Sequence, residues 1–300
     1  MKSILTGRYS IALGVCAALA FSTSSLAQTA TYPSAEAAAT ALVQAIQAHD
    51  HMEVAKVLGP DWKTYVPTDD LDREDVYTFL AAYQVSHKLV SDGAVQHLSV
   101  GKNDWRLPIP IVPKGSQWTF DLKAAKEEIR IRQIGRNELN TQLAVLAYYD
   151  AQRDYALHDH NGDGILEYAQ KFISTPGKQD GLYWDAKDGE PQSPLGPAFA
   201  KDKPKGGVGY HGYDYRILTA QGPSAPGGAY DYIVGGRMRN GFALVAWPIR
   251  YGETGVMSFM VSHDGVLFEK DLGKDGGAVA MAMKKFDPDD SWHEDDDLDP

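Results

Sequence analysis

Cysteine is almost absent from this chain. Among its 300 residues there is one, Cys16, and it lies within the first 27 residues. A single thiol forms no intramolecular disulfide, and a zinc site built from several cysteines is excluded as well. If the first 27 residues are removed, no cysteine nucleophile remains either. The fold must then be stable through its core alone.

Positive charge is also scarce. The chain has 29 Lys and Arg residues against 40 Asp and Glu residues, which gives a formal net charge of -11. Because DNA, RNA and acidic membrane surfaces are polyanions, they repel such a protein, so no nucleic-acid partner is expected. With 43% apolar and 23% charged residues, the composition is typical of a globular protein.

Long hydrophobic runs are missing except for a short one near the N-terminus. Lys2 and Arg8 give a positive start, residues 11–21 form an apolar segment, and residues 25–27 end in small side chains. This pattern predicts a signal peptide over residues 1–27. We therefore expect a periplasmic or secreted protein that is not inserted in the membrane after cleavage.

Two alternatives to a cleaved signal peptide remain open. A membrane anchor is disfavoured because the apolar run is about half of the roughly 20 residues that span a bilayer. Lipidation at Cys16 is disfavoured because Val15 is larger than the residue that lipoprotein signals carry there.

The 273 residues left after removal of 27 from 300 exceed the usual length of one domain. Helices followed by short strands, then a long helix and more strands, predict an α+β protein in two parts. We expect an N-terminal α+β domain over 28–121, a linker helix over 122–157, a C-terminal domain over 158–286 and an acidic, flexible, solvated tail over 287–300.

The N-terminal part is predicted to be helical first and extended afterwards. Ser34 can cap a helix that ends before Gly59 and Pro60. The remaining expected elements are a helix over 71–89 and strands over 96–100, 107–112 and 117–121. This order, with Leu-Gly-Pro-Asp-Trp after the first helical segment, resembles the NTF2-like folds. The resemblance implies a domain that binds a small ligand or associates with a partner.

The C-terminal part is rich in glycine and tyrosine and has the pattern of an antiparallel meander. Asp264 and Gly265 separate two apolar segments, which predicts a hairpin because both residues tolerate positive φ. We expect this sheet to pack on the long helix. The expected strands cover residues 213–220, 229–234, 242–249, 255–262 and 266–270.

Several short segments carry a family resemblance. They lie at residues 136–139, 150–152, 181–184, 193–197, 210–213, 218–222 and 241–248. Together they are similar to the uncharacterised bacterial domain-of-unknown-function family 2950. The resemblance implies an exported protein in two parts and no known reaction.

A second resemblance concerns the C-terminal half alone. A long helix, Tyr183-Trp184, Tyr215-Arg216 and the segment 251–259 before an Asp-Gly hairpin resemble the globular heads of pilin-like and pseudopilin proteins. This resemblance implies a helix packed on a sheet. The hydrophobic, membrane-inserted helix start of pilins is absent.

One segment has the spacing of a calcium loop. Oxygen-bearing side chains at positions 1, 3 and 5 with Gly at position 6 form the first half of an EF-hand-type loop. Position 12 holds Gln170, where a bidentate Glu is expected. The predicted Ca²⁺ ligands are Asp159, Asn161, Asp163, Ile165 through its carbonyl group, Glu167 and Gln170.

Two other interpretations of this segment stay open. It forms an Asn-Gly-Asp-Gly turn without metal if its side chains bond local amides. His158 and His160 could instead belong to a site for a softer metal, which needs a third ligand.

No catalytic motif survives a check of its context. Residues 207–212 match the spacing of a dinucleotide loop, but no strand precedes them and no helix follows. His211, Asp214 and a serine such as Ser193 or Ser224 can be combined into a triad only on paper. Tyr183, Trp184, Tyr213 and Trp247 could stack on a sugar or peptide, although core and sheet packing is the simpler and favoured explanation.

The chain is therefore predicted to be an exported α+β binding or interaction module. Its partner is an unknown envelope protein or glycan, and Ca²⁺ is its one candidate cofactor. The alternative is an envelope hydrolase that acts on glycan or peptide through acids near His211 and Asp214. The sequence leaves open whether the protein is an enzyme, and the non-catalytic function is favoured.

Overall fold

The computed structural model describes residues 29–66, 68, 73–187, 189–196 and 209–295. The predicted signal peptide lies outside these residues. Within them, no helix has the length and apolar character that a membrane span requires. The chain divides into two compact units, residues 1–125 and 126–300, and helix α4 (Leu122–Tyr155) crosses the division. Both units combine helices with antiparallel sheets, so the predicted α+β class is confirmed.

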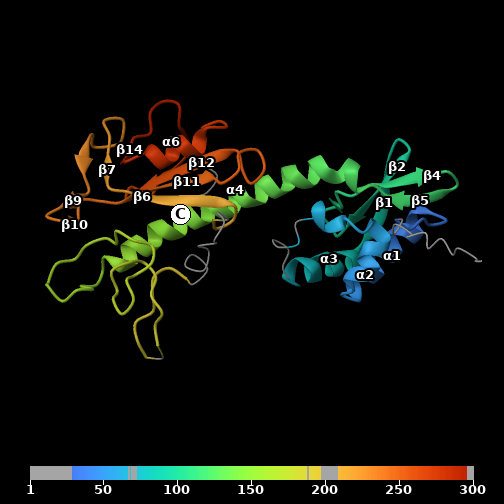
Figure 1. Cartoon of the computed structure of the whole chain (residues 1–300), viewed down its shortest axis with the longest axis horizontal. Coiled ribbons are helices and arrows are strands. Elements are labelled where there is room, and N and C mark those ends of the chain that lie inside the picture. The colour runs from blue at the N-terminus through green and yellow to red at the C-terminus, as the bar shows by residue number, and fades with distance from the viewer. Residues whose placement is uncertain (1–28, 67, 69–72, 188, 197–208, 296–300) are drawn as a thin grey trace, which may run out of the picture. The chain divides into compact units, whose positions relative to one another are not determined.

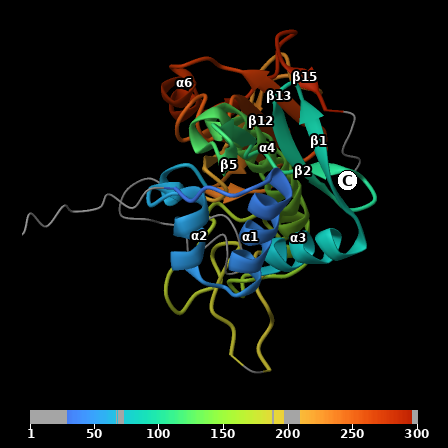
Figure 2. The same cartoon turned by 90° about the vertical axis from the view of Figure 1, so that its right-hand side faces the viewer.

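The first unit begins with helices that follow the predicted caps. The Ser34 hydroxyl accepts the Ala37 amide at 3.1 Å, as expected for a cap. The single helical segment predicted up to residue 58 is divided, because His49 adopts a left-handed φ of 52° and Asp50 caps a second helix. The first two helices lie side by side (Figure 1, Figure 2). The helices are α1 (Ala35–Gln47), α2 (His51–Leu58), the 3-10 helix η1 (Trp62–Thr64) and α3 (Arg73–Val85).

The sheet of the first unit contains five strands, two more than the three predicted for the N-terminal part. Helix α3 ends at Val85, and residues 87–92, of which the first three were expected to be helical, form a strand of a hairpin that turns at Gly93 with φ of 60°. Pro108 and Pro110, which lack amide donors, lie outside the strands, so the strand predicted over 107–112 begins only at Ile111 and continues through Pro113. The strands pair in the order β1-β2-β4-β5, with β3 on β2. They are β1 (His87–Asp92), β2 (Val95–Val100), β3 (Trp105–Arg106), β4 (Ile111–Lys114) and β5 (Gln117–Phe120).

The second unit is built on a five-stranded antiparallel sheet with the order β15-β13-β12-β11-β6. The predicted hairpin at Asp264-Gly265 is present and joins β12 to β13, with Gly265 at φ of 82°. The strands are β6 (Tyr213–Leu218), β11 (Ala243–Pro248), β12 (Met257–Ser262), β13 (Leu267–Asp271) and β15 (His293–Glu294).

Several small elements surround this sheet. The predicted strand over 229–234 is divided into two short strands, whereas the elements at 237–238, 276–282 and 285–286 were not predicted. A short helix, α6 (Gly276–Ala282), packs against β11. The remaining strands are β7 (Ala220–Gln221), β8 (Tyr230–Asp231) and β14 (Lys285–Phe286) in one small sheet, and β9 (Ile233–Val234) with β10 (Arg237–Met238) in another.

Two helices cover opposite faces of the five-stranded sheet (Figure 1). On one face, the Tyr215 hydroxyl lies 3.4 Å from the Thr141 hydroxyl of α4. Because side chains alternate along a strand, Asp214 points to the other face, and so does its cross-strand partner Trp247. A Cβ atom placed on Gly277 of α6 would lie 3.6 Å from the Trp247 ring. The sheet is therefore enclosed between α4 and α6.

The predicted solvated tail differs from the structure over residues 287–295. The Trp292 side chain is only 8% exposed, and Lys270 lies 5.7 Å from the centre of its ring. The Asp295 amide donates to the Leu267 carbonyl group at 2.9 Å. Burial of the Trp292 ring and the backbone hydrogen bond of Asp295 thus outweigh the repulsion between neighbouring acidic side chains. Residues 296–300 lie outside the described part of the chain.

Candidate functional site

The predicted calcium loop follows the end of α4 and wraps around one carboxylate. Asp159 Oδ1 accepts the amides of Asn161 at 3.2 Å and Gly162 at 2.8 Å, and its Oδ2 accepts the Gly164 amide at 2.7 Å. The two glycines adopt φ of 76° and 79°, which other residues rarely adopt. These amides, that of Gly164 foremost, hold the pKa of Asp159 below its usual value. The loop is thus pre-organised around an ionised carboxylate.

An arginine that sequence reasoning did not find lies beside this loop. Arg237, on β10, pairs with Asp163, and its Nη1 lies 3.8 Å from Glu167 Oε1. Its hydrogen bond lowers the pKa of Asp163. The Asn161 amide group donates to Glu167 at 3.0 Å. Since Arg237 is far from the loop in sequence, no local pattern could have indicated it. It supplies a positive charge to two of the predicted calcium ligands.

The structure brings together four of the predicted ligand side chains and separates one. Asp159, Asn161, Asp163 and Glu167 belong to the same loop, where the Ile165 amide donates to Asp163 at 3.0 Å. Gln170 is directed elsewhere, because its side-chain amide donates to the Gly236 carbonyl oxygen at 3.0 Å. Among the described residues, no group of three or more His, Cys, Asp and Glu side chains is arranged to hold a metal ion. The assignment to calcium stays a prediction.

The two histidines near this loop take part in aromatic packing. The His160 ring stacks on the Tyr155 ring with 3.9 Å between centroids, and its Nε2 lies 3.0 Å from the Tyr155 carbonyl oxygen. The His158 and His160 rings are 6.2 Å apart and nearly perpendicular. These contacts account for His160 without a metal.

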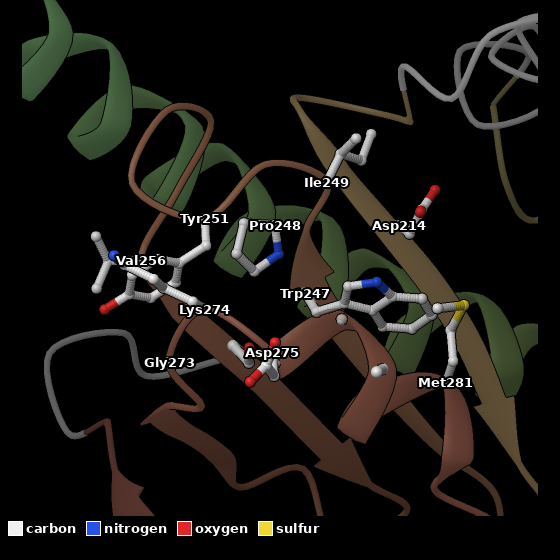
Figure 3. A pocket seen from close by; sticks show the side chains of 14 residues that line it. Asp214, Trp247, Pro248, Ile249, Tyr251, Val256, Gly273, Lys274, Asp275 and Met281 are labelled. Atoms are coloured by element: carbon white, nitrogen blue, oxygen red, sulfur yellow. The ribbon is translucent and has the colours of Figure 1, made fainter.

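A hollow of about 270 Å³ lies on the α6 side of the five-stranded sheet (Figure 3). Three neighbouring strands supply its floor. Asp214 of β6 pairs with Trp247 of β11. On the other side of β11, Phe259 of β12 pairs with Ala246, so the preceding residue of β12, Ser258, lies opposite Trp247. This register places Asp214, Trp247 and Ser258 in one row across the sheet. The rim comes from the loop 249–256 and from residues 273–281 around α6.

The floor of the hollow contains polar groups that the described part of the chain leaves without partners. The Ser258 side chain is 1% exposed, and its Oγ atom has no hydrogen-bond partner. Buried polar atoms are normally paired, so each exception needs an explanation. Among described residues, no hydrogen bond or ion pair involves the Asp214 carboxylate, and its burial raises its pKa. Both groups are available to a ligand.

The rim of the hollow adds charges of both signs. Lys274 and Asp275 lie in the segment that leads into α6, so the lining contains two acids and one base. Figure 3 shows Lys274 at the opposite end of the hollow from Asp214. Arg216, two residues after Asp214 on β6, donates to the Met281 carbonyl oxygen. Within the described part of the chain, burial is the cause of the raised pKa of Asp214, and no neighbouring charge offsets it.

The predicted pair His211 and Asp214 is not brought into one hollow. His211, with a left-handed φ of 53°, lines a separate hollow of about 350 Å³ together with Asn140 and Leu143 of α4. Asp214 lines the hollow on the α6 side. The Ser193 hydroxyl donates to the Leu195 carbonyl oxygen at 2.9 Å. This arrangement does not favour the hydrolase alternative.

The described residues thus define an α+β protein whose C-terminal unit carries an open, polar hollow on a sheet face. The chain belongs to the family described as Protein of unknown function (DUF2950), whose model matches residues 29–294. The family resemblance expected from the sequence is confirmed. No curated protein and no solved structure matches the chain.

Proposed function

We propose that this protein is an exported, non-catalytic binding module of the bacterial envelope, which holds a small ligand or part of a glycan or protein in the hollow on the α6 side. One observation carries the proposal: the buried Ser258 hydroxyl, without a partner among described residues, lies on the floor of that hollow. An unpaired buried hydroxyl costs about 1–3 kcal/mol, which a bound ligand would recover.

Two further features belong to this proposal. The positive start and short apolar segment within residues 1–27 support export to the periplasm or beyond the cell. A Ca²⁺ ion in the loop from Asp159 to Glu167 would serve as a structural ion if the carboxylates of Asp163 and Glu167 turned from Arg237 toward Asp159. Calcium would take the place of the Arg237 ion pairs.

Ligand-observed NMR with a panel of small polar molecules and envelope-glycan fragments tests the binding function. We expect at least one compound whose signal is lost in Ser258→Val, because valine removes the hydroxyl and narrows the floor. Ser99→Val is the matched control, since Ser99 is equally buried and unpartnered but lies on β2, outside the hollow. Binding that persists in Ser258→Val, or no binding by any compound, would contradict the proposal.

A further inference from the structure

The floor of the hollow offers hydrogen-bond acceptors rather than a paired network. A carboxylate is an acceptor only, and the Asp214 carboxylate forms no hydrogen bond with any described residue. Ser258 adds a hydroxyl that both donates and accepts. A ligand that satisfies this floor must therefore bring donors to Asp214.

Charge narrows the choice of donor. A carboxylate that loses its water contacts and gains no positively charged partner costs free energy. A neutral ligand would displace water from Asp214 without supplying a positive charge in its place. An organic ammonium group supplies three donors and a positive charge in one small group. Ca²⁺ fits less well, because it requires six to eight oxygen ligands and the lining supplies two carboxylates at separate places.

The geometry of the row sets the length of the ligand. Asp214 and Ser258 lie on the two strands that flank β11, which places their backbones roughly 10 Å apart. One ammonium group cannot contact both side chains. The ligand must carry its amine at one end and a second polar group, such as a hydroxyl, some distance away.

The middle of the row and the volume set its bulk. Trp247 lies between the two polar ends, and an indole ring attracts both a cation and the C–H groups of a compact ligand. A volume of about 270 Å³ is close to the lower limit of ligand sites in proteins, so the ligand is small or is one unit of a larger chain.

We propose that the hollow binds a small hydroxylated primary amine, with its ammonium group on the Asp214 carboxylate and a hydroxyl group on Ser258. This inference rests on the binding function proposed above and specifies its ligand class. The same chemistry is found in an amino sugar and in an open-chain amino alcohol.

A matched set of ligands tests the contribution of the amine to binding separately from the contribution of the rest of the ligand. Calorimetric titrations near pH 6.5 would compare glucosamine with glucose and N-acetylglucosamine. At this pH an amine is protonated whether its pKa is roughly 7.7, like that of an α-amino group, or roughly 10.4, like that of lysine. These sugars share a ring, but only glucosamine carries an ammonium group. 3-Aminopropanol and n-propanol form the corresponding open-chain pair. We expect each amine to bind on the order of tenfold more tightly than its neutral counterpart.

Two variants connect this selectivity to the proposed contacts. Asp214→Asn keeps the shape and removes the charge, so the preference for amines should disappear. Ser258→Ala should weaken binding of the amine while its preference over the neutral counterpart remains. Asp231→Asn, an exposed acid on β8, is the matched control and should change nothing.

The outcomes distinguish this inference from the function on which it rests. Equal binding of glucose, N-acetylglucosamine and glucosamine would overturn the amine assignment and leave a neutral-sugar site. An amine preference that survives in Asp214→Asn would also overturn it. If 3-aminopropanol binds and glucosamine does not, the ligand is an open-chain amine. If no panel compound binds and Ser258→Val changes nothing, the binding function itself fails.

Discussion

At the residue scale, Asp214 combines a cost to folding with a use in binding. Burial of its carboxylate raises its pKa, and no described partner offsets that effect. Groups kept for ligand contact often reduce stability in this way, because the fold provides no partner for them. Asp214 is thus a residue whose removal should affect stability and binding in opposite directions.

Asp214→Asn should therefore stabilise the protein at neutral pH, because it removes a carboxylate whose ionisation burial disfavours. Because the folded-state pKa is raised above 3.8, ionisation favours the unfolded state. The advantage of the variant should be absent below about pH 3.8 and grow as the pH rises through the raised pKa. Thermal unfolding across this range checks the expectation.

Lower stability of Asp214→Asn at neutral pH would contradict this account. It would mean that the carboxylate has a structural partner in the folded protein. Asp231→Asn serves as the control again, since it removes an exposed carboxylate of the same unit.

The loop at Asp159 leads to a second expectation at this scale. About 1 mM calcium should raise the melting temperature by a few degrees, because an ion that binds only the folded state stabilises it. Asp159→Ala should abolish the shift, since this carboxylate organises the loop through three amides. Differential scanning fluorimetry with calcium and with a chelator measures both effects.

Arg237 provides the sharper control for calcium. Its pairs with Asp163 and Glu167 compete with a metal ion, so Arg237→Gln should increase the calcium-dependent shift. Asp154→Ala, at an exposed site near the end of α4, should leave the shift unchanged. No shift in the wild type at this concentration would remove calcium from the proposal and leave a metal-free turn.

The candidate site was only partly predictable at this scale. Asp214 and Trp247 stood out in the sequence, the first beside His211 and the second among aromatic residues that could stack on a ligand. Their neighbour Ser258 did not, because only strand register brings β12 beside β11 and places this serine in the row. Long-range pairing of this kind leaves no local signal in the sequence.

At the element scale, predictions held where the local backbone chemistry decided the structure. The Asp264-Gly265 hairpin and the Ser34 cap depend on one or two residues, and both are present. The helix predicted over 34–58 was divided because His49 takes a left-handed φ of 52°, which its residue type does not require. Helix α6 was not predicted because Gly276 and Gly277 are poor helix formers. Packing of this segment on Trp247 favours the helix despite the two glycines.

Gly265 of the hairpin between β12 and β13 gives a prediction for which Gly93, in another hairpin, is the control. Gly265→Ala should destabilise the protein by about 1–3 kcal/mol, because its φ is 82° and its new Cβ would lie 3.1 Å from the Tyr149 ring. Gly93→Ala has a positive φ of 60° with nothing within 4 Å, so it should cost less. Chemical denaturation of both variants measures the difference, and equal losses would show that Tyr149 adds no steric cost.

At the scale of the whole molecule, both candidate sites belong to one of the two units. The calcium loop and the hollow lie within residues 126–300, whereas the sheet β1–β5 belongs to residues 1–125. A ligand bound at either site should therefore leave the N-terminal unit unaffected. The location of each binding site can be measured in the full chain.

Hydrogen exchange with mass spectrometry should show this separation. A bound hydroxylated amine should slow exchange in β6, β11 and β12, because it bridges three strands that form the floor of the hollow. Calcium should slow exchange in the loop from Asp159 to Glu167, whose amides already point at carboxylates. The strands β1–β5 should be unchanged in both experiments. Protection of those strands by the amine would place its binding site in the first unit and contradict the assignment to the hollow beside α6.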